Sequence, residues 1–143
     1  PMLSSNKIDS SKIKKTSYIL IVISVVPFGL FFAGFAEEIL TIWLGDAFAS
    51  KSSLVFQILT LGLMFNSIAQ VPFASIQASG NSKATALLHL IECLPYLVLL
   101  WWLITHYGIV GAAWAWTIRM LIDMFLLTAI DNIQSIRKLI LKD

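Results

Sequence analysis

Long runs of apolar residues alternate with short polar segments along this chain of 143 residues. Four runs, at 17–36, 54–76, 86–105 and 112–130, each supply the ~20 mainly apolar residues that a helix needs to cross a bilayer. The runs are solidly apolar and lack the alternation that is typical of membrane β-strands. The pattern therefore predicts an all-α, polytopic membrane protein with four transmembrane helices.

The segments between the runs predict how these helices are joined. Residues 37–53 mix apolar and polar side chains, which predicts an interfacial or re-entrant helix that ends near Gly45. Residues 78–83 form a tight polar turn and residues 106–111 an equally short one. The second, third and fourth helices are therefore expected to pack as antiparallel neighbours. The residues after Asp131 predict an amphipathic C-terminal tail on the membrane surface.

Composition supports the membrane class and excludes others. The chain is 58% hydrophobic and 13% charged, against roughly 45–50% and 25% in soluble domains. A soluble domain of this length cannot bury so much apolar surface, because small folds leave a large share of their area in water. The net charge of +2 is too small for a nucleic-acid-binding surface, so no nucleic acid is expected as a partner. The single cysteine, Cys93, permits no disulfide within the chain.

The distribution of basic residues predicts the orientation. Eight of the ten Lys and Arg residues lie in the N-terminal tail, the second connection or the C-terminal tail. On the opposite side there is only Lys51, and Arg119 lies inside the fourth run. Basic flanks face the cytoplasm, so both termini are expected there. All five tryptophans fall near the opposite interface, where aromatic rings accumulate.

Charged residues inside the apolar runs indicate candidate chemistry. Glu92 lies in the third run, and Arg119 and Asp123 lie one turn apart in the fourth. Helix geometry places Glu92 and Asp123 at similar depth, with Arg119 ~6 Å further out. We expect a cluster in which Arg119 bridges the two carboxylates. This cluster serves an anionic substrate or a coupling ion, or it is a structural charge pair that holds two helices together.

Other polar residues share predicted helix faces. His89, Glu92 and Tyr96 follow i, i+3, i+7 spacing, which fits a proton relay or a hydrogen-bonded structural face. One His-x-x-Glu pair supplies too few ligands for a metal, so no metal or other cofactor is expected. Asn66 and Gln70 lie one turn apart and are expected to face the bundle, where they contact a sugar or a neighbouring helix. No enzyme motif occurs, so no catalytic residue is proposed.

Several segments, taken in order, resemble one family. They are Pro-x-Leu-Ser at 1–4, Ile-Leu-x-x-Trp-Leu-Gly at 39–45, Val71-Pro72 with the Ala-x-Gly turn and Lys83, and Gly-Ile-x-Gly-Ala-Ala at 108–113 followed by Arg119. Together they resemble the polysaccharide and O-antigen flippases. The superfamily of these flippases also contains the multidrug and toxic compound extrusion transporters.

The resemblance implies a function in the bacterial inner membrane. Family members move an undecaprenyl-pyrophosphate-linked oligosaccharide repeat unit from the cytoplasmic to the periplasmic leaflet, using two lobes around a cationic cavity. Residues 1–143 would then be a single membrane domain, the C-terminal part of the second lobe. The opening Pro1-Met2 fits a fragment or a processed product. The expected partners are the lipid-linked oligosaccharide, membrane lipid, and a missing N-terminal lobe or other membrane subunits.

Two alternatives remain open at this point. A cation-coupled multidrug antiporter would use Glu92 or Asp123 to bind a proton or Na⁺. A non-transporting membrane module would instead assemble with a partner chain.

Overall fold

Helices account for nearly all of the chain, which confirms the predicted all-α class. The computed structural model describes residues 2–140, with the side chains of 2–11, 138 and 139 left out of the description. Within this range there is no strand. The elements are α1 (Met2–Gly34), α2 (Ala36–Leu44), α3 (Asp46–Ala78) and α4 (Ser82–Ile140).

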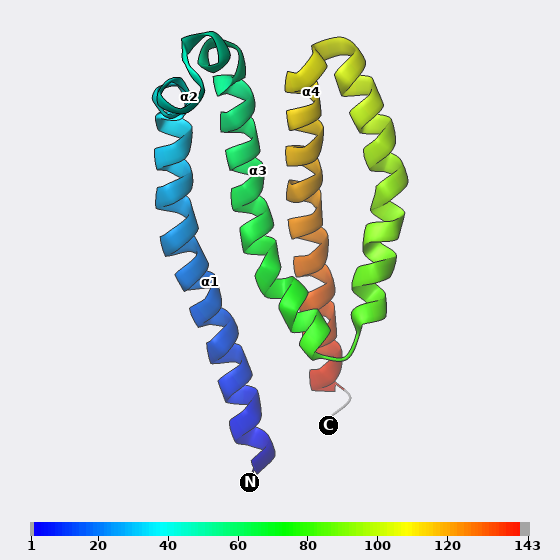
Figure 1. Cartoon of the computed structure of the whole chain (residues 1–143). Helices are drawn as coiled ribbons and strands as arrows, with labels where there is room; N and C mark the ends of the chain where they lie inside the picture. The colour runs from blue at the N-terminus through cyan, green and yellow to red at the C-terminus, as the bar shows by residue number, and fades with distance from the viewer. Residues whose placement is uncertain (1, 141–143) are drawn as a thin grey trace.

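The long element α4 consists of two helices that meet at Gly108 and run in opposite directions (Figure 1). Gly108 adopts φ 59° and ψ −136°, a conformation open to glycine because it has no Cβ. We call residues 82–107 the outgoing arm and residues 109–140 the returning arm. A Cβ on Gly111 would collide with the Leu103 carbonyl of the outgoing arm. The predicted turn at 106–111 is therefore confirmed, and its small residues allow the two arms to approach closely.

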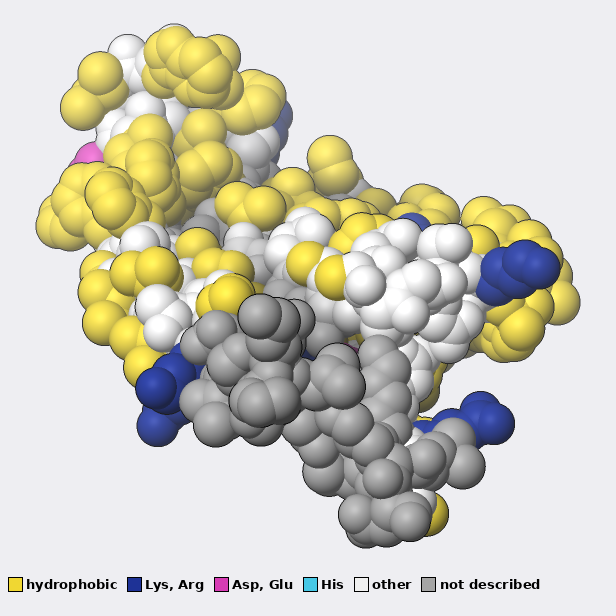
Figure 2. Space-filling view, turned by 90° about the horizontal axis from the view of Figure 1, so that it is seen from below, with side chains coloured by type: hydrophobic (Ala, Val, Ile, Leu, Met, Phe, Trp, Pro, Cys, Tyr) yellow, Lys and Arg dark blue, Asp and Glu magenta, His cyan; other side chains and the backbone are white. Residues whose placement is uncertain are grey.

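The two ends of the described chain lie at the same end of the bundle (Figure 1). The turn between α3 and α4 lies there too, with Gly80 at φ 80°, which confirms the predicted polar turn. Lys and Arg side chains stand out in the view of this end, and hydrophobic side chains cover much of the visible flanks (Figure 2). The structure thus agrees with both termini lying on one side, and their cytoplasmic location stays a prediction.

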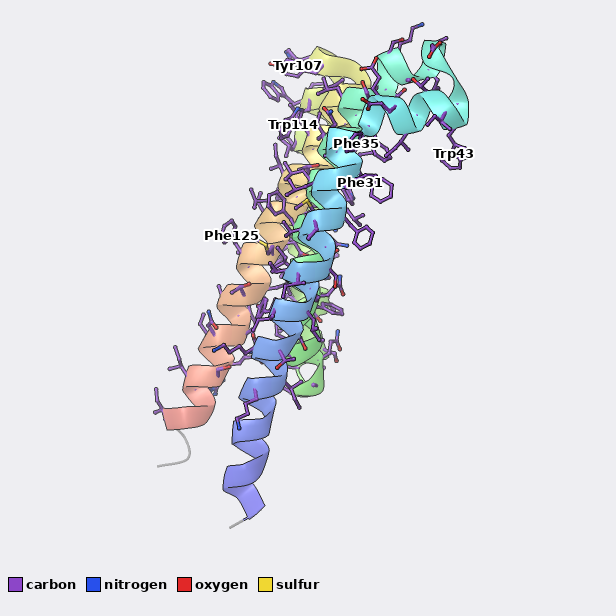
Figure 3. The ribbon with its side chains drawn as sticks, turned by 90° about the vertical axis from the view of Figure 1, so that its left-hand side faces the viewer. Phe31, Phe35, Trp43, Tyr107, Trp114 and Phe125 are labelled. Atoms are coloured by element: carbon purple, nitrogen blue, oxygen red, sulfur yellow. The ribbon has the colours of Figure 1, made fainter. Side chains whose placement is uncertain are left out.

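At the opposite end, α2 is the short helix that the sequence predicts. It ends at Leu44, and Gly45 separates it from α3 at φ 86°. Ile42 and Trp43 are 88% and 80% exposed, and Trp43 projects away from the other helices at the end where Tyr107 also lies (Figure 3). The helix and its exposed apolar side chains fit an interfacial position, which stays a prediction.

The central helix is α3, which packs against α1, α2 and α4. Buried Ala69, Ile76 and Leu127 form the main core between α3 and the returning arm. Further along the same interface, a Cβ on Gly62 would come within 2.5 Å of the Trp116 ring. The hydroxyl of Thr117 donates a hydrogen bond of 2.8 Å to a carbonyl of α3 nearby. This interface therefore has the tight packing of a protein interior.

Elsewhere the apolar surface remains uncovered. Phe28, Leu90 and Leu94 are 66%, 71% and 72% exposed. The total accessible area of 9822 Å² exceeds the about 7,400 Å² of a compact soluble protein of this mass. Three helical stretches are long and apolar enough to cross a membrane: Lys12–Gly34, Asp46–Ala78 and Ser82–Arg137. The membrane class is confirmed, and the count of four crossings stays a prediction, because the last stretch contains the reversal at Gly108.

The predicted C-terminal tail is helical and continues the returning arm without a break through Ile140. No glycine or proline follows Gly111, so nothing in this sequence interrupts the helix. Ile133, Ile136 and Ile140 are all exposed. Their contact with a membrane surface stays a prediction.

Candidate functional site

Three ionisable side chains meet between the two arms of α4. The Nδ1 atom of His89 lies 3.6 Å from Oε2 of Glu92 and 3.4 Å from Oδ1 of Asp123. One nitrogen or carboxylate oxygen from each of the three residues lies within 4.8 Å of the corresponding atoms of the other two. We call this group the His-Glu-Asp cluster.

The position of the cluster follows from the reversal at Gly108. Glu92 lies 16 residues before this glycine and Asp123 lies 15 residues after it. Antiparallel helices with the same rise per residue therefore bring the two acids to the same height. His89 lies one turn from Glu92 on the same face, and its ring centroid is 6.1 Å from that of Phe73 in α3. Two of the three predicted members, Glu92 and Asp123, and the predicted relay residue His89 are thus brought together.

The two acids of the cluster are buried, and several of its polar atoms lack hydrogen-bond partners. Glu92 and Asp123 are 8% and 7% exposed. Among the described residues, the buried side-chain atoms without a hydrogen bond are His89 Nδ1, both carboxylate oxygens of Glu92, Oδ1 of Asp123 and Nε of Arg119. Buried polar groups are normally paired, and leaving one unpaired costs free energy. Four of these five atoms belong to the His-Glu-Asp cluster, which therefore has the capacity to bind something more.

Arg119 differs from its expected position. Its guanidinium carbon lies 4.9 Å from the centroid of the Tyr96 ring, in a cation–π arrangement. No ion pair within 4 Å joins it to Glu92 or Asp123, although all three side chains are described. His89, instead of Arg119, lies between the two carboxylates. Arg119 is one turn closer to Gly108 than Asp123, as predicted, but its side chain lies against Tyr96 at that height and does not reach back to the carboxylates.

The two predicted polar residues of α3 lie outside the cluster. Asn66 is half-buried and Gln70 is exposed, and neither side chain makes a hydrogen bond with a described residue. A hydrogen bond between α3 and α1 comes instead from Gln57, whose amide donates to the Ala33 carbonyl of α1 at 3.0 Å. The structure therefore joins α3 to α1 through a residue that the candidate site did not include.

A second charged group was not predicted. Asp131, only 4% exposed, forms an ion pair with Lys14 of α1. The same carboxylate accepts a hydrogen bond of 2.7 Å from Ser75 of α3. We call these residues the Lys14–Ser75–Asp131 cluster. The available signal was that opposite charges flank the first and fourth apolar runs at the same predicted side of the membrane.

Comparison with known proteins connects this structure to a family. No family model matches the chain, and no solved structure matches it. A curated protein of Shigella flexneri, named "Putative O-antigen transporter", is 42% identical over 108 residues. The match covers 76% of this chain but 25% of that protein, so the chain corresponds to about a quarter of the relative's length. The chain is therefore related to the O-antigen flippase family, which confirms the resemblance carried by its sequence motifs.

Proposed function

We propose that this chain is part of a multi-pass transporter that carries O-antigen building blocks across the bacterial inner membrane. The observation that carries the proposal is its 42% identity to the "Putative O-antigen transporter" of Shigella flexneri over 76% of the chain. At a finer level, we propose that the cargo is an undecaprenyl-pyrophosphate-linked oligosaccharide, which is flipped from the cytoplasmic to the periplasmic leaflet. The function is transport, with no covalent chemistry.

Arg119 is the proposed anion-binding group. Ionisable residues within membrane bundles usually face a cavity or pathway, because charge in lipid is costly. With no carboxylate of a described residue within 4 Å, the guanidinium keeps donors available for phosphate oxygens. The His-Glu-Asp cluster beside it would serve coupling or positioning. Asn66 and Gln70 remain proposed sugar contacts on α3.

The exposed apolar flanks support a partner within the membrane. Alternating access requires two bundles that move against each other around a shared site. We propose that this chain supplies part of one such bundle, with its termini in the cytoplasm. Membrane lipid and either an N-terminal lobe or other membrane subunits would then cover the exposed flanks, where residues such as Leu90 and Leu94 are more than 70% exposed.

A chimera tests this proposal directly. The matching segment of the Shigella flexneri protein would be replaced by the corresponding 108 residues of this chain. The chimera would be expressed in a strain that lacks its own O-antigen transporter. We expect it to restore surface O-antigen and to prevent lipid-linked sugar from accumulating.

Arg119→Ala in the same chimera is the informative variant. Its control is Lys51→Ala, which changes an exposed basic residue in the first turns of α3. Loss of surface O-antigen at full membrane abundance supports a role for Arg119 in transport. Unchanged O-antigen in the Arg119→Ala chimera would leave the charge with a structural role. A chimera that is abundant in the membrane yet inactive would contradict the proposed function.

A second function is favoured by one observation. Glu92 and Asp123 are buried and lack hydrogen bonds, as a cation-coupled drug antiporter would require of its ion site. Cells that express such an antiporter would resist cationic drugs, without any effect on lipid-linked sugars. The two measurements on the same strains therefore separate the two functions.

A further inference from the structure

The His-Glu-Asp cluster has the composition of a metal site. His89 offers an imidazole nitrogen, and Glu92 and Asp123 offer carboxylate oxygens. A single His-x-x-Glu pair is too small a ligand set, but the reversal at Gly108 adds Asp123 as the third ligand. One nitrogen and two carboxylates suit a divalent transition metal better than Na⁺ or Mg²⁺, which bind chiefly through oxygen.

The distances also fit. With metal–ligand bonds of about 2.0–2.2 Å, adjacent ligand atoms in a tetrahedral site lie about 3.3–3.6 Å apart. Nδ1 of His89 lies 3.6 Å from the Glu92 carboxylate and 3.4 Å from that of Asp123. The separation between the two carboxylates is at most 4.8 Å, so metal binding requires at most a small closure. Rotation of the terminal carboxylates supplies that closure, because their last torsion has a broad energy well.

The lack of partners at these atoms is independent support. Both acidic side chains are at least nine-tenths buried, and their oxygens toward the cluster accept no hydrogen bond. A proton on Nδ1 of His89 would donate to only one of them and leave the other uncompensated. An ion at the centre would contact all three ligands at once.

We propose that His89, Glu92 and Asp123 bind one divalent transition-metal ion with the coordination chemistry of Zn²⁺. Three protein ligands leave a fourth position open for water or for another ligand. The His89 side chain is 37% exposed, so the cluster is open on that side.

Bound metal would reverse the local charge. The two carboxylates and Arg119 leave one net negative charge when His89 is neutral, and a divalent cation turns this into one net positive charge. The open position could then accept a pyrophosphate oxygen. This last step rests on the proposed function, whereas the metal site itself does not.

Cobalt titration of the full chain in lipid nanodiscs tests the site, because tetrahedral Co²⁺ absorbs visible light strongly. We expect saturable binding of one equivalent that Zn²⁺ displaces and an equal concentration of Mg²⁺ does not. Glu92→Gln, Asp123→Asn and His89→Gln should each weaken binding by more than about tenfold. The matched controls Glu37→Gln, Asp46→Asn and His106→Gln change exposed residues and should bind like the parent.

Thermal unfolding shows whether each variant is folded. Zn²⁺ should raise the Tm of the parent and the controls, since a ligand that binds the folded state stabilises it, and should leave the three cluster variants unchanged. Absence of saturable Co²⁺ binding, displacement by Mg²⁺, or equal binding by all variants would overturn the proposal and leave a proton as the only ion of this cluster. If the protein binds no metal but the chimera restores O-antigen, the metal site is wrong and the proposed function stands. If the protein binds metal but the chimera fails to restore O-antigen, the metal site stands and the proposed function is wrong.

Discussion

Two buried acids on the returning arm, Asp123 and Asp131, have opposite surroundings. They are 7% and 4% exposed and lie about two helical turns apart. Asp131 is paired with Lys14 and accepts a hydrogen bond from Ser75. Asp123 faces Glu92 and His89, and its Oδ1 has no hydrogen-bond partner. Both carboxylates are removed from water, but only that of Asp131 has both a lysine partner and a hydrogen-bond donor.

The difference separates structure from function on a single helix. The Lys14–Ser75–Asp131 cluster ties α1, α3 and α4 together near the end that holds the termini. The unpaired atoms of the His-Glu-Asp cluster connect no helices through hydrogen bonds. The free energy lost by burying these polar atoms is therefore not regained through hydrogen bonds. Proteins tolerate such a cost mainly where a site needs it.

Asp131→Ala is expected to have the largest effect on stability. The change leaves Lys14 and Ser75 without their shared partner and disconnects three helices. We expect the free energy of unfolding in mixed detergent to fall by about 3 kcal/mol. Asp46→Ala, which removes an exposed acid, is the control and should change it by less than about 0.5 kcal/mol. Equal losses in both variants would contradict a compensated role for Asp131.

Arg119→Ala should affect transport more than folding. Removing the guanidinium takes away charge-assisted hydrogen bonds to an anionic headgroup, worth about 1.5–3 kcal/mol. Transport in the chimera should therefore fall by about tenfold or more, with membrane abundance unchanged. Rescue by Arg119→Lys to an intermediate level would indicate that charge contributes beyond geometry. Full transport by Arg119→Ala is the contrary outcome.

Glu92→Gln should have the opposite sign from Asp131→Ala. It removes an uncompensated buried charge, so in chelator-treated protein the free energy of unfolding should rise by about 1 kcal/mol. Glu37→Gln, at an exposed site, is the matched control. A loss of stability in Glu92→Gln would show that the His-Glu-Asp cluster is compensated after all, and the contrast with Asp131 would disappear.

Tyr96→Leu is expected to have the smallest effect on stability. The ring lies 4.9 Å from the Arg119 guanidinium, and the loss of this cation–π contact should cost about 0.5–1 kcal/mol of unfolding free energy. In an Arg119→Ala background the same change should cost less, because the partner is gone. Additive effects in this double-mutant cycle would argue against the contact.

The sequence predicted the helices and turns that depend on hydropathy and on glycine-containing turns. Local residues determine the apolar runs, the turn at Gly80, the short helix that ends just before Gly45 and the reversal near Gly108. The flippase motifs also carried the family relationship, because their order and spacing are visible without a structure.

The sequence did not predict which side chains meet between helices, because these contacts depend on the rotation of each helix about its axis. Spacing gave the depth of Arg119 but not the direction of its side chain, so its contact with Tyr96 in place of the carboxylates was not foreseen. His89 was placed on the correct face of its helix, without its approach to Asp123 across the arms. The Lys14–Asp131 pair joins residues that are 117 positions apart, and only the charge of Lys14 contributed to the prediction of orientation.

The reversal at Gly108 also has a consequence for motion, because a small rotation there moves residues far along each arm by a large distance. Within α4 it is the residue with non-helical torsions, and each arm is otherwise a continuous helix. Glu92 lies 16 residues from it, or roughly 24 Å along the axis. A swing of roughly 5° about this one pivot therefore displaces Glu92 by about 2 Å relative to Asp123, enough to separate or close the ligands of a small cation.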